Sequence, residues 1–404
     1  MARLLDHLMS RSAPGEPLQR ARPWLLLLDQ FLFESAARTH SAPHVRDRVS
    51  VQGVMNNFVI ATLPCWAIGL WSLGHQSNRA MADLGIGTLP GWRGDLIGAW
   101  GIGYDPSNLW ACFFHGLLYF LPILLLSLLV AAAWEVLFAS VRRRPLSEGV
   151  LAFAWLFALV MPAGVALYQV VLGLSFGLVV GAAVYGGSGR YLVNPALLGL
   201  TFLLFAYPDL VFGPNAWVPI PGFEASPPLG LAVSGGIDAV LAAGYTAWDL
   251  FLGVRPGTLG SPSVLGALIG AVYLVATDSV SWRILAGALL GMMGTVLLFN
   301  GLAPEDNAMA TIPWGWHLLV GGFVFGTVFF ATDPVAAATT QGGRWMFGLL
   351  VGVLTMVIGV TNPVYNEGVL FAVLLASLFA PVLDFVVVEL NIRRRRRRLA
   401  EGLP

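Results

Sequence analysis

The sequence predicts an all-α polytopic membrane protein with about ten transmembrane helices. Of its 404 residues, 57% are hydrophobic and only 11% are charged, whereas soluble globular domains carry about 25% charged residues. Apolar runs approaching the roughly 20 residues that span a bilayer recur along the chain, with polar breaks between them. The basic residues are concentrated in alternate breaks. These observations exclude a soluble enzyme and a disordered chain.

Ten apolar segments are expected to cross the membrane as helices, because backbone polar groups in lipid must be paired within the segment. The predicted spans are residues 53–74, 111–139, 149–164, 166–184, 194–208, 263–279, 283–300, 316–331, 345–361 and 367–388. They define two five-helix halves, some of whose helices are short or broken. The predicted organisation is a cytoplasmic N-terminal segment (1–52), membrane half one (53–208), an extracytoplasmic loop (209–262), membrane half two (263–388) and a basic cytoplasmic tail (389–404).

The orientation follows from the arginines, which make up all 22 basic residues. Only Arg79, Arg93 and Arg255 fall in breaks assigned to the outside. The positive-inside rule therefore predicts an even number of spans in a bacterial inner membrane, with both termini in the cytoplasm. The run Arg393–Arg398 is expected to anchor the last span near anionic lipid rather than to bind nucleic acid.

Two spans, 194–208 and 316–331, are short and bordered by Gly- and Pro-containing sequence. Interrupted spans of this kind are typical of transporters with a site near the middle of the membrane. The pattern Gly173–Gly177 in span four resembles Gly322–Gly326 in span eight, which is a weak indication of an internal repeat.

Ionisable residues inside apolar spans are costly and indicate an ion path. Glu135 precedes the Arg142–Arg144 cluster, so neutralisation by that cluster and a place on an ion path are both open. Asp384 lies further from the nearest arginines and favours an ion-path role. Asp333 precedes Pro334, where a turn or capping role and cation coordination remain alternatives.

The Gly186–Arg190 turn leads into Asn194-Pro195, which indicates a helix start. Backbone donors and Arg190 could bind an anion or the polar edge of a flavin there. Cys65, Cys112 and the histidines show no metal-ligand spacing, and no motif for soluble-enzyme catalysis is present. We expect no metal site and no catalytic residue in this chain.

Several motifs in order along nearly the whole chain resemble the NqrB/RnfD family, which comprises the B-type membrane subunit of the Na⁺-translocating NADH:quinone oxidoreductase and its relative in the Rnf complex. The matching segments are Pro43–Asp47, Trp134–Ala139, Gly189-Arg190 with Asn194–Leu197, Pro256-Gly257, Ser281–Arg283, Pro313-Trp314 with Trp316-His317, Ala331–Pro334, and Ala380-Pro381 with Asp384.

The resemblance implies a ten-helix fold with an internal repeat, a cation path, riboflavin in the membrane domain and a nearby quinone site. It places Glu135 and Asp384 on or beside the cation route, with Phe325 and Phe329 lining a constriction.

The resemblance also implies cofactor contacts. Asn194 would lie near the riboflavin, although Tyr191 stands where the family commonly has Asn. Ala132 and Ala133 occupy a place beside the quinone site that paired Gly often hold.

One motif of the family is missing. The family carries FMN as a phosphate ester on the Thr of a Ser-Gly-Ala-Thr motif, and the aligned segment here reads Glu224-Ala225-Ser226-Pro227. Pro227 stands at the acceptor position and has no hydroxyl to esterify. The sequence thus predicts a divergent member without covalent FMN.

The leading hypothesis is a membrane core subunit of a sodium-translocating NADH:quinone oxidoreductase. Its partners would be other subunits, lipid and quinone, with ubiquinone as substrate and riboflavin as the candidate noncovalent cofactor. The alternative is a flavin-poor transporter or channel subunit of another ion-translocating complex. A third hypothesis is a scaffold that only assembles other subunits.

Overall fold

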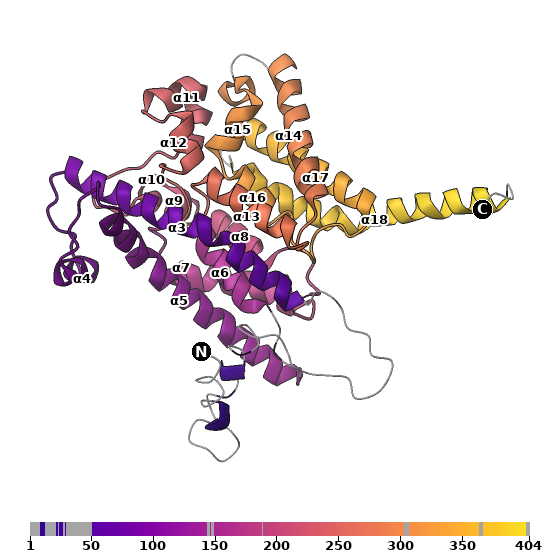
Figure 1. Cartoon of the computed structure of the whole chain (residues 1–404), viewed down its shortest axis with the longest axis horizontal. Helices are drawn as coiled ribbons and strands as arrows, with labels where there is room; N and C mark the ends of the chain where they lie inside the picture. Colours follow the sequence, from indigo (N-terminus) through magenta and orange to yellow (C-terminus); the bar gives the residue numbers. More distant parts are fainter. Residues whose placement is uncertain are drawn as a thin grey trace.

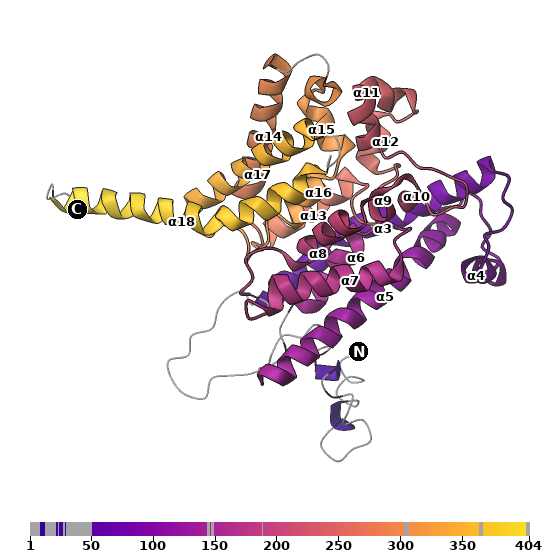
Figure 2. The same cartoon turned by 180° about the vertical axis from the view of Figure 1, so that it is seen from behind.

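The computed structural model describes residues 9–12, 22, 24–26, 29, 51–143, 146, 149–187, 189–302, 307–362 and 367–400. Through these residues the chain is helical and contains no strand, which confirms the predicted all-α membrane fold (Figures 1 and 2). Most of the predicted N-terminal segment, including the motif at Pro43–Asp47, lies outside the described residues.

Each predicted span of half one coincides with a helix. The spans are α3 (Val51–Asp83), α5 (Leu109–Arg142), α6 (Val150–Val160), α7 (Leu167–Phe176) with its π-helical continuation Gly177–Ala183, and α8 (Pro195–Ala206). Asn194 begins α8: its side chain accepts hydrogen bonds from the backbone N–H groups of Ala196 and Leu197, which satisfies donors that a helix start leaves unpaired.

Half two contains α13 (Val264–Ala276), α14 (Trp282–Leu302), α15 (Trp314–Val320), α16 (Phe323–Phe329), α17 (Gln341–Thr361) and α18 (Gly368–Ala400). The predicted span 316–331 is therefore two short helices separated at Gly321 and Gly322. Five helices, α3, α5, α14, α17 and α18, are each long and apolar enough to cross a membrane. Both views show the last turns of α18 projecting away from the bundle (Figures 1 and 2).

Short helices fill the long connections between the spans. They are α4 (Trp92–Trp100), α9 (Pro208–Phe212), α10 (Pro214–Trp217), α11 (Pro228–Ala242), α12 (Ala247–Leu252) and a 3₁₀ turn at Ala308–Thr311. Pro227 is the N-cap of α11.

Four helix contacts recur in the two halves, although the extensive packing of α3 on α5 has no comparable counterpart between α13 and α14. In half one α5 packs on α7, α7 on α8, α6 on α8 and α3 on α6; in half two α14 packs on α17, α17 on α18, α16 on α18 and α13 on α16. This pattern supports two five-helix halves. It makes span four correspond to α17, so the Gly173–Gly177 and Gly322–Gly326 patterns do not occupy equivalent places.

Two spans of half two approach each other closely where α14 crosses α17. A Cβ atom on Gly287 or Gly291 would collide with backbone atoms of α17, and one on Gly348 or Gly352 would collide with backbone atoms of α14. Small residues of this kind let membrane helices pack backbone to backbone.

Connections on one side of the bundle lie together, and we call this side the inner end. There Asn57 donates to Ser279 (2.8 Å), Arg142 donates to the carbonyl of Ala183 (2.6 Å), and Asn194 meets Asp333. We call the opposite side the outer end; there the 84–108 connection, α9 to α12 and the 3₁₀ turn gather. The clustering agrees with the predicted alternation of spans, while the assignment of the inner end to the cytoplasm stays a prediction.

Candidate functional site

The broken span α15–α16 lies at the centre of the candidate site. Phe325 and Phe329 on α16 are both buried, and their ring centroids are 4.9 Å apart. Phe329 lies against α13 at Gly270, where a Cβ atom would stand 2.8 Å from the Phe329 ring. The two rings therefore fill the space between α16 and α13, while their role as a constriction on an ion route stays a prediction.

A buried polar cluster lies just beyond the C-terminal end of α16. The Tyr191 hydroxyl donates to both carboxylate oxygens of Asp333, at 2.9 and 3.1 Å, and the Asn194 side-chain amide donates to Oδ2 at 2.7 Å. All three side chains are 3% exposed or less. Because Tyr191 and Asn194 belong to half one and Asp333 to half two, the cluster joins the halves at the inner end.

Asp333 also shapes its own turn. Its Oδ1 accepts from the backbone N–H groups of Val335 (2.9 Å) and Ala336 (3.1 Å). The turn role considered from the sequence is thereby confirmed. Hydrogen bonds from several donors make a buried carboxylate tolerable in a membrane protein, where an unpaired charge is costly.

A large polar cavity opens beside this cluster at the inner end. It contains about 960 Å³ of empty space between the α13–α14 connection and the loop that joins α16 to α17. Its ionisable lining residues are Asp278, Arg283, Asp333 and Arg344. We call it the inner cavity. A hydrated ion entering it would reach Asp333 before the phenylalanine rings.

Asp384 fixes the other end of the α16–α17 loop. Its carboxylate accepts hydrogen bonds from the backbone N–H and the hydroxyl of Thr339 and of Thr340, at 2.5 to 2.9 Å. The side chain is partly buried, and Gly343 leaves room for it because a Cβ there would collide with Oδ1. Thr339 also lines the inner cavity. The α16–α17 loop thus contains Asp333 and is bonded to Asp384 of α18, and it directly follows the helix that carries Phe325 and Phe329.

Glu135 lies apart from this group. It is 5% exposed on α5 and faces a small cavity formed with Val150 of α6, the π-helix and Gly187. The Arg142 guanidinium is directed elsewhere: it donates to the Ala183 carbonyl and lies 5.2 Å from the Phe138 ring centroid. Arg144 lies outside the described residues. Neutralisation by the arginine cluster and a place on an ion path therefore both stay predictions for Glu135.

The residues expected near a flavin are separated. Asn194 uses its oxygen to cap α8 and its amide to reach Asp333, and the Tyr191 hydroxyl is bound to the same carboxylate. Arg190 is exposed on the loop before them. The arrangement thus leaves Asn194 and Tyr191 little hydrogen-bonding capacity for riboflavin.

The candidate quinone residues face different ways. Ala132 packs against Leu151 and is 6% exposed, whereas Ala133 is on the exposed side of α5. Among the described residues no group of three or more His, Cys, Asp or Glu could hold a metal ion.

Sequence reasoning missed two features. It did not pair Tyr191 with Asp333, which are 142 positions apart. It also left Glu367 and Arg255 without a role, although Arg255 is one of three arginines on the side that the positive-inside rule disfavours.

Comparison with known proteins agrees with this architecture. The profile of the NQR2, RnfD, RnfE family matches residues 38–393. The chain belongs to this family. The resemblance seen in the motifs is thereby confirmed.

Relatives within the family match almost end to end. A protein of Pseudomonas paraeruginosa, named as the B-type subunit of Na⁺-translocating NADH-quinone reductase, is 43% identical over 98% of this chain and 98% of its own. Proteins of the same name from Azotobacter vinelandii (42% identical over 94% of this chain and 95% of that one) and Chromohalobacter salexigens (43% over 93% and 91%) are similar to it.

Proposed function

We propose that this chain is the membrane core subunit of a sodium-translocating NADH:quinone oxidoreductase. The observation that carries the proposal is the 43% identity over 98% of both chains to a relative of that name. NADH would be oxidised by other subunits of the complex, with ubiquinone as the acceptor, so this chain contributes to a translocase without catalysing the redox step alone. The predicted setting is a bacterial inner membrane, with both termini in the cytoplasm.

The cation route we propose begins in the inner cavity and leads past Asp333 to Phe325 and Phe329. In this proposal Asp333, which lines the cavity, and Asp384, which is bonded to the lining residue Thr339, would attract the cation, and the two packed rings would form the constriction. Glu135 would act separately, on the face of α5 that meets α6 and the π-helix. Polar side chains beside a broken helix are the usual form of a membrane ion site.

Cofactor contacts form a further part of the proposal. Quinone would approach α5 near Ala132 and Ala133, and flavin would take part in the complex as a redox carrier. Riboflavin, if held here, would need the Asp333 cluster to rearrange and Arg190 to turn inward. Covalent FMN on this chain is not expected, because Pro227 at the start of α11 offers no hydroxyl.

The test is NADH-driven uptake of ²²Na⁺ by the assembled complex in proteoliposomes with a water-soluble ubiquinone. We expect uptake that a sodium ionophore abolishes and a protonophore does not. NADH oxidation without sodium uptake, in a complex that contains this chain, would refute the proposal.

A second candidate, a flavin-poor transporter or channel subunit, is favoured by Pro227 alone. Denaturing gel electrophoresis of the complex should show no flavin fluorescence on this chain. Sodium flux that requires no NADH, in vesicles that contain no flavin, would favour the second candidate over the first.

A further inference from the structure

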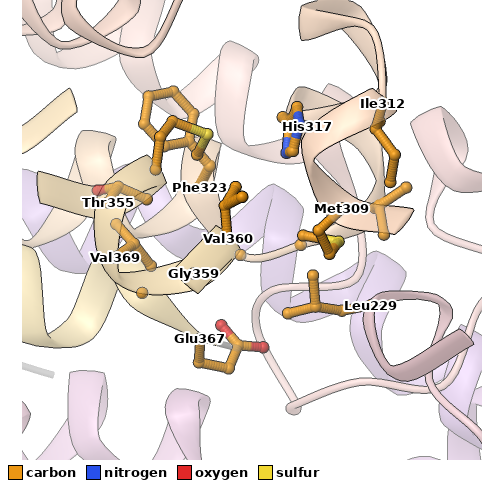
Figure 3. Close-up of a pocket in the computed structure, with 15 residues that line it drawn as sticks. Leu229, Met309, Ile312, His317, Phe323, Thr355, Gly359, Val360, Glu367 and Val369 are labelled. Carbon is orange, nitrogen blue, oxygen red and sulfur yellow. The ribbon is translucent and has the colours of Figure 1, made fainter. Parts of the chain in front are cut away.

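A second cavity lies at the outer end, beside the break between α15 and α16. It encloses about 460 Å³ including open solvent, of which about 30 Å³ is accessible to the centre of a water molecule, and its walls come from α15, α16, α17, the start of α18 and Leu229 of α11 (Figure 3). We call it the outer cavity. Most of its lining is apolar, so its few polar groups identify what it can bind.

Glu367, at the start of α18, supplies the carboxylate of the outer cavity. Figure 3 shows the carboxylate turned toward Gly359 and Val360, and a Cβ atom on Gly322 would stand 3.2 Å from Oε2. The side chain is partly open, and no hydrogen bond to Glu367 from another described side chain occurs. Within the described residues the Glu367 carboxylate thus differs from that of Asp333, whose two oxygens are filled by Tyr191, Asn194 and its own turn.

Arg255 places a fixed positive charge close to Glu367. Its guanidinium donates to four backbone carbonyls, those of Pro262 (2.8 Å), Ser261 (3.1 Å), Gly321 (3.1 Å) and Val320. The last two close the C-terminal end of α15, where carbonyls lack helical partners. Arg255 acts electrostatically on Glu367, but within the described chain no hydrogen bond joins them. Burial disfavours the ionised Glu367 carboxylate, and the fixed charge of Arg255 offsets part of that cost without a hydrogen bond to its oxygens.

Two further polar groups face the same space. His317 is 7% exposed, and its Nε2 has no hydrogen-bond partner among the described residues. Thr355 donates its hydroxyl proton to the Val351 carbonyl (2.7 Å) and keeps lone pairs for another contact. Figure 3 shows the carboxylate, the hydroxyl and the imidazole on different sides of the cavity, so Glu367 is the charged ligand for a small cation and the other two are neutral polar groups of the lining.

The position of the outer cavity relates it to the route proposed above. Glu367 lies beside Gly322 just before α16, Asp333 follows the other end of α16, and Phe325 and Phe329 lie between them. The seven residues of α16 correspond to about 10 Å of helix. The two carboxylates therefore stand on opposite sides of the ring constriction.

We propose that the outer cavity is the release site for the transported cation, with Glu367 as its ligand and Arg255 as the charge that keeps its affinity low. Conduction requires a site that attracts the ion yet lets it leave. The proposal rests on the cation route of the proposed function and extends it across the rings.

The test uses the assembled complex in proteoliposomes and compares Glu367→Gln and Glu367→Asp with Glu224→Gln. Glu224 is an exposed carboxylate in the outer loop, so the control makes the same chemical change away from the cavity. We expect Glu367→Gln to lower NADH-driven ²²Na⁺ uptake by roughly tenfold, the scale of losing one contact to a charged group. Glu367→Asp should retain part of the uptake, and Glu224→Gln should match the wild type.

A second measurement does not depend on turnover. Met309 lines the outer cavity, so Met309→Cys can be labelled with a membrane-impermeant thiol reagent; the native Cys65 and Cys112 are buried and provide a quiet background. Replacing choline with Na⁺ should slow the labelling, and this protection should vanish in Glu367→Gln.

The outcomes are distinct. Two results together would overturn the release site alone. They are sodium uptake by Glu367→Gln at the wild-type rate, and no slowing of Met309→Cys labelling by Na⁺ when Glu367 is intact. A wild-type complex without NADH-driven uptake would overturn the proposed function, and the labelling would then still decide whether the cavity binds Na⁺ through Glu367.

Discussion

The two carboxylates near the ends of α16 are stabilised in different ways. At the inner end, Asp333 is held by Tyr191, Asn194 and its own turn, and it joins the two halves. At the outer end, Glu367 has a single fixed countercharge nearby and faces an open cavity.

Buried carboxylates in this membrane protein therefore have two different structural roles. A carboxylate whose oxygens are filled by protein donors organises the fold, and a ligand must displace those donors to bind. A carboxylate supported only by a nearby charge retains free oxygens and can exchange a ligand. If this division is right, variants at the two ends of α16 must differ in stability and in sodium uptake.

Arg255→Leu should have the largest effect. It removes the partner of a buried charge and leaves four backbone carbonyls without their donor, a loss of about 4 kcal/mol. The melting temperature of the assembled complex should fall sharply, whereas Arg79→Leu, at an exposed arginine of the same outer end, should leave it nearly unchanged. Adding Glu367→Gln to Arg255→Leu should recover part of the loss. A double variant less stable than Arg255→Leu would show that the two charges do not balance each other.

Asp333→Ala should destabilise the inner end by about 3 kcal/mol, because it orphans the buried donors of Tyr191 and Asn194 and two backbone N–H groups. The same melting assay measures this effect. Glu367→Ala should cost much less, since no donor of another described side chain is bound to it. Equal losses of stability for Asp333→Ala and Glu367→Ala would show that protein donors hold the two carboxylates equally.

Asp384→Ala should cost about 1 to 2 kcal/mol, because the carboxylate accepts from Thr339 and Thr340 but is only partly buried. Assembly should survive, which lets ²²Na⁺ uptake be measured on an intact complex. Reduced sodium uptake would support a role of Asp384 on the ion path. Unchanged uptake would show that Asp384 only stabilises the α16–α17 loop.

Tyr191→Phe should have the smallest effect, about 1 kcal/mol, because it deletes one hydroxyl while the ring keeps its edge-to-face packing on Phe153 (5.3 Å between centroids). In the Asp333→Ala background the same change should cost almost nothing. Additive losses would contradict a direct bond between the two side chains.

Most of the fold could be predicted from the sequence. Hydropathy placed every predicted span on helical sequence, and five of these helices are long and apolar enough to cross a membrane, because the signal is local. Hydropathy did not locate helix ends that continue beyond the lipid, so α3 extends past the predicted residue 74 to Asp83, and α18 past residue 388 to Ala400. It also did not show that the repeat equates α7 with α17.

The site was only partly predictable. Asp333, Asp384, Phe325 and Phe329 were identified as candidates, but their grouping depends on contacts between segments far apart in the chain. Glu367 was missed because it stands at the first residue of a predicted span, where a polar residue is unremarkable. Arg255 could have pointed to Glu367, because an arginine on the outer side, which the positive-inside rule disfavours, suggests a nearby carboxylate.

The bond from half one to Asp333 also limits how the protein can move. Pulling the halves apart at the inner end would strip a buried carboxylate of its Tyr191 and Asn194 donors, which costs several kcal/mol. At the outer end the link between the halves is indirect: Ser72 of α3 donates to the Arg255 carbonyl (3.3 Å), and the Arg255 guanidinium donates to the carbonyls of Val320 and Gly321. Any rocking of one half against the other should therefore pivot near Asp333, where the two halves are bonded directly.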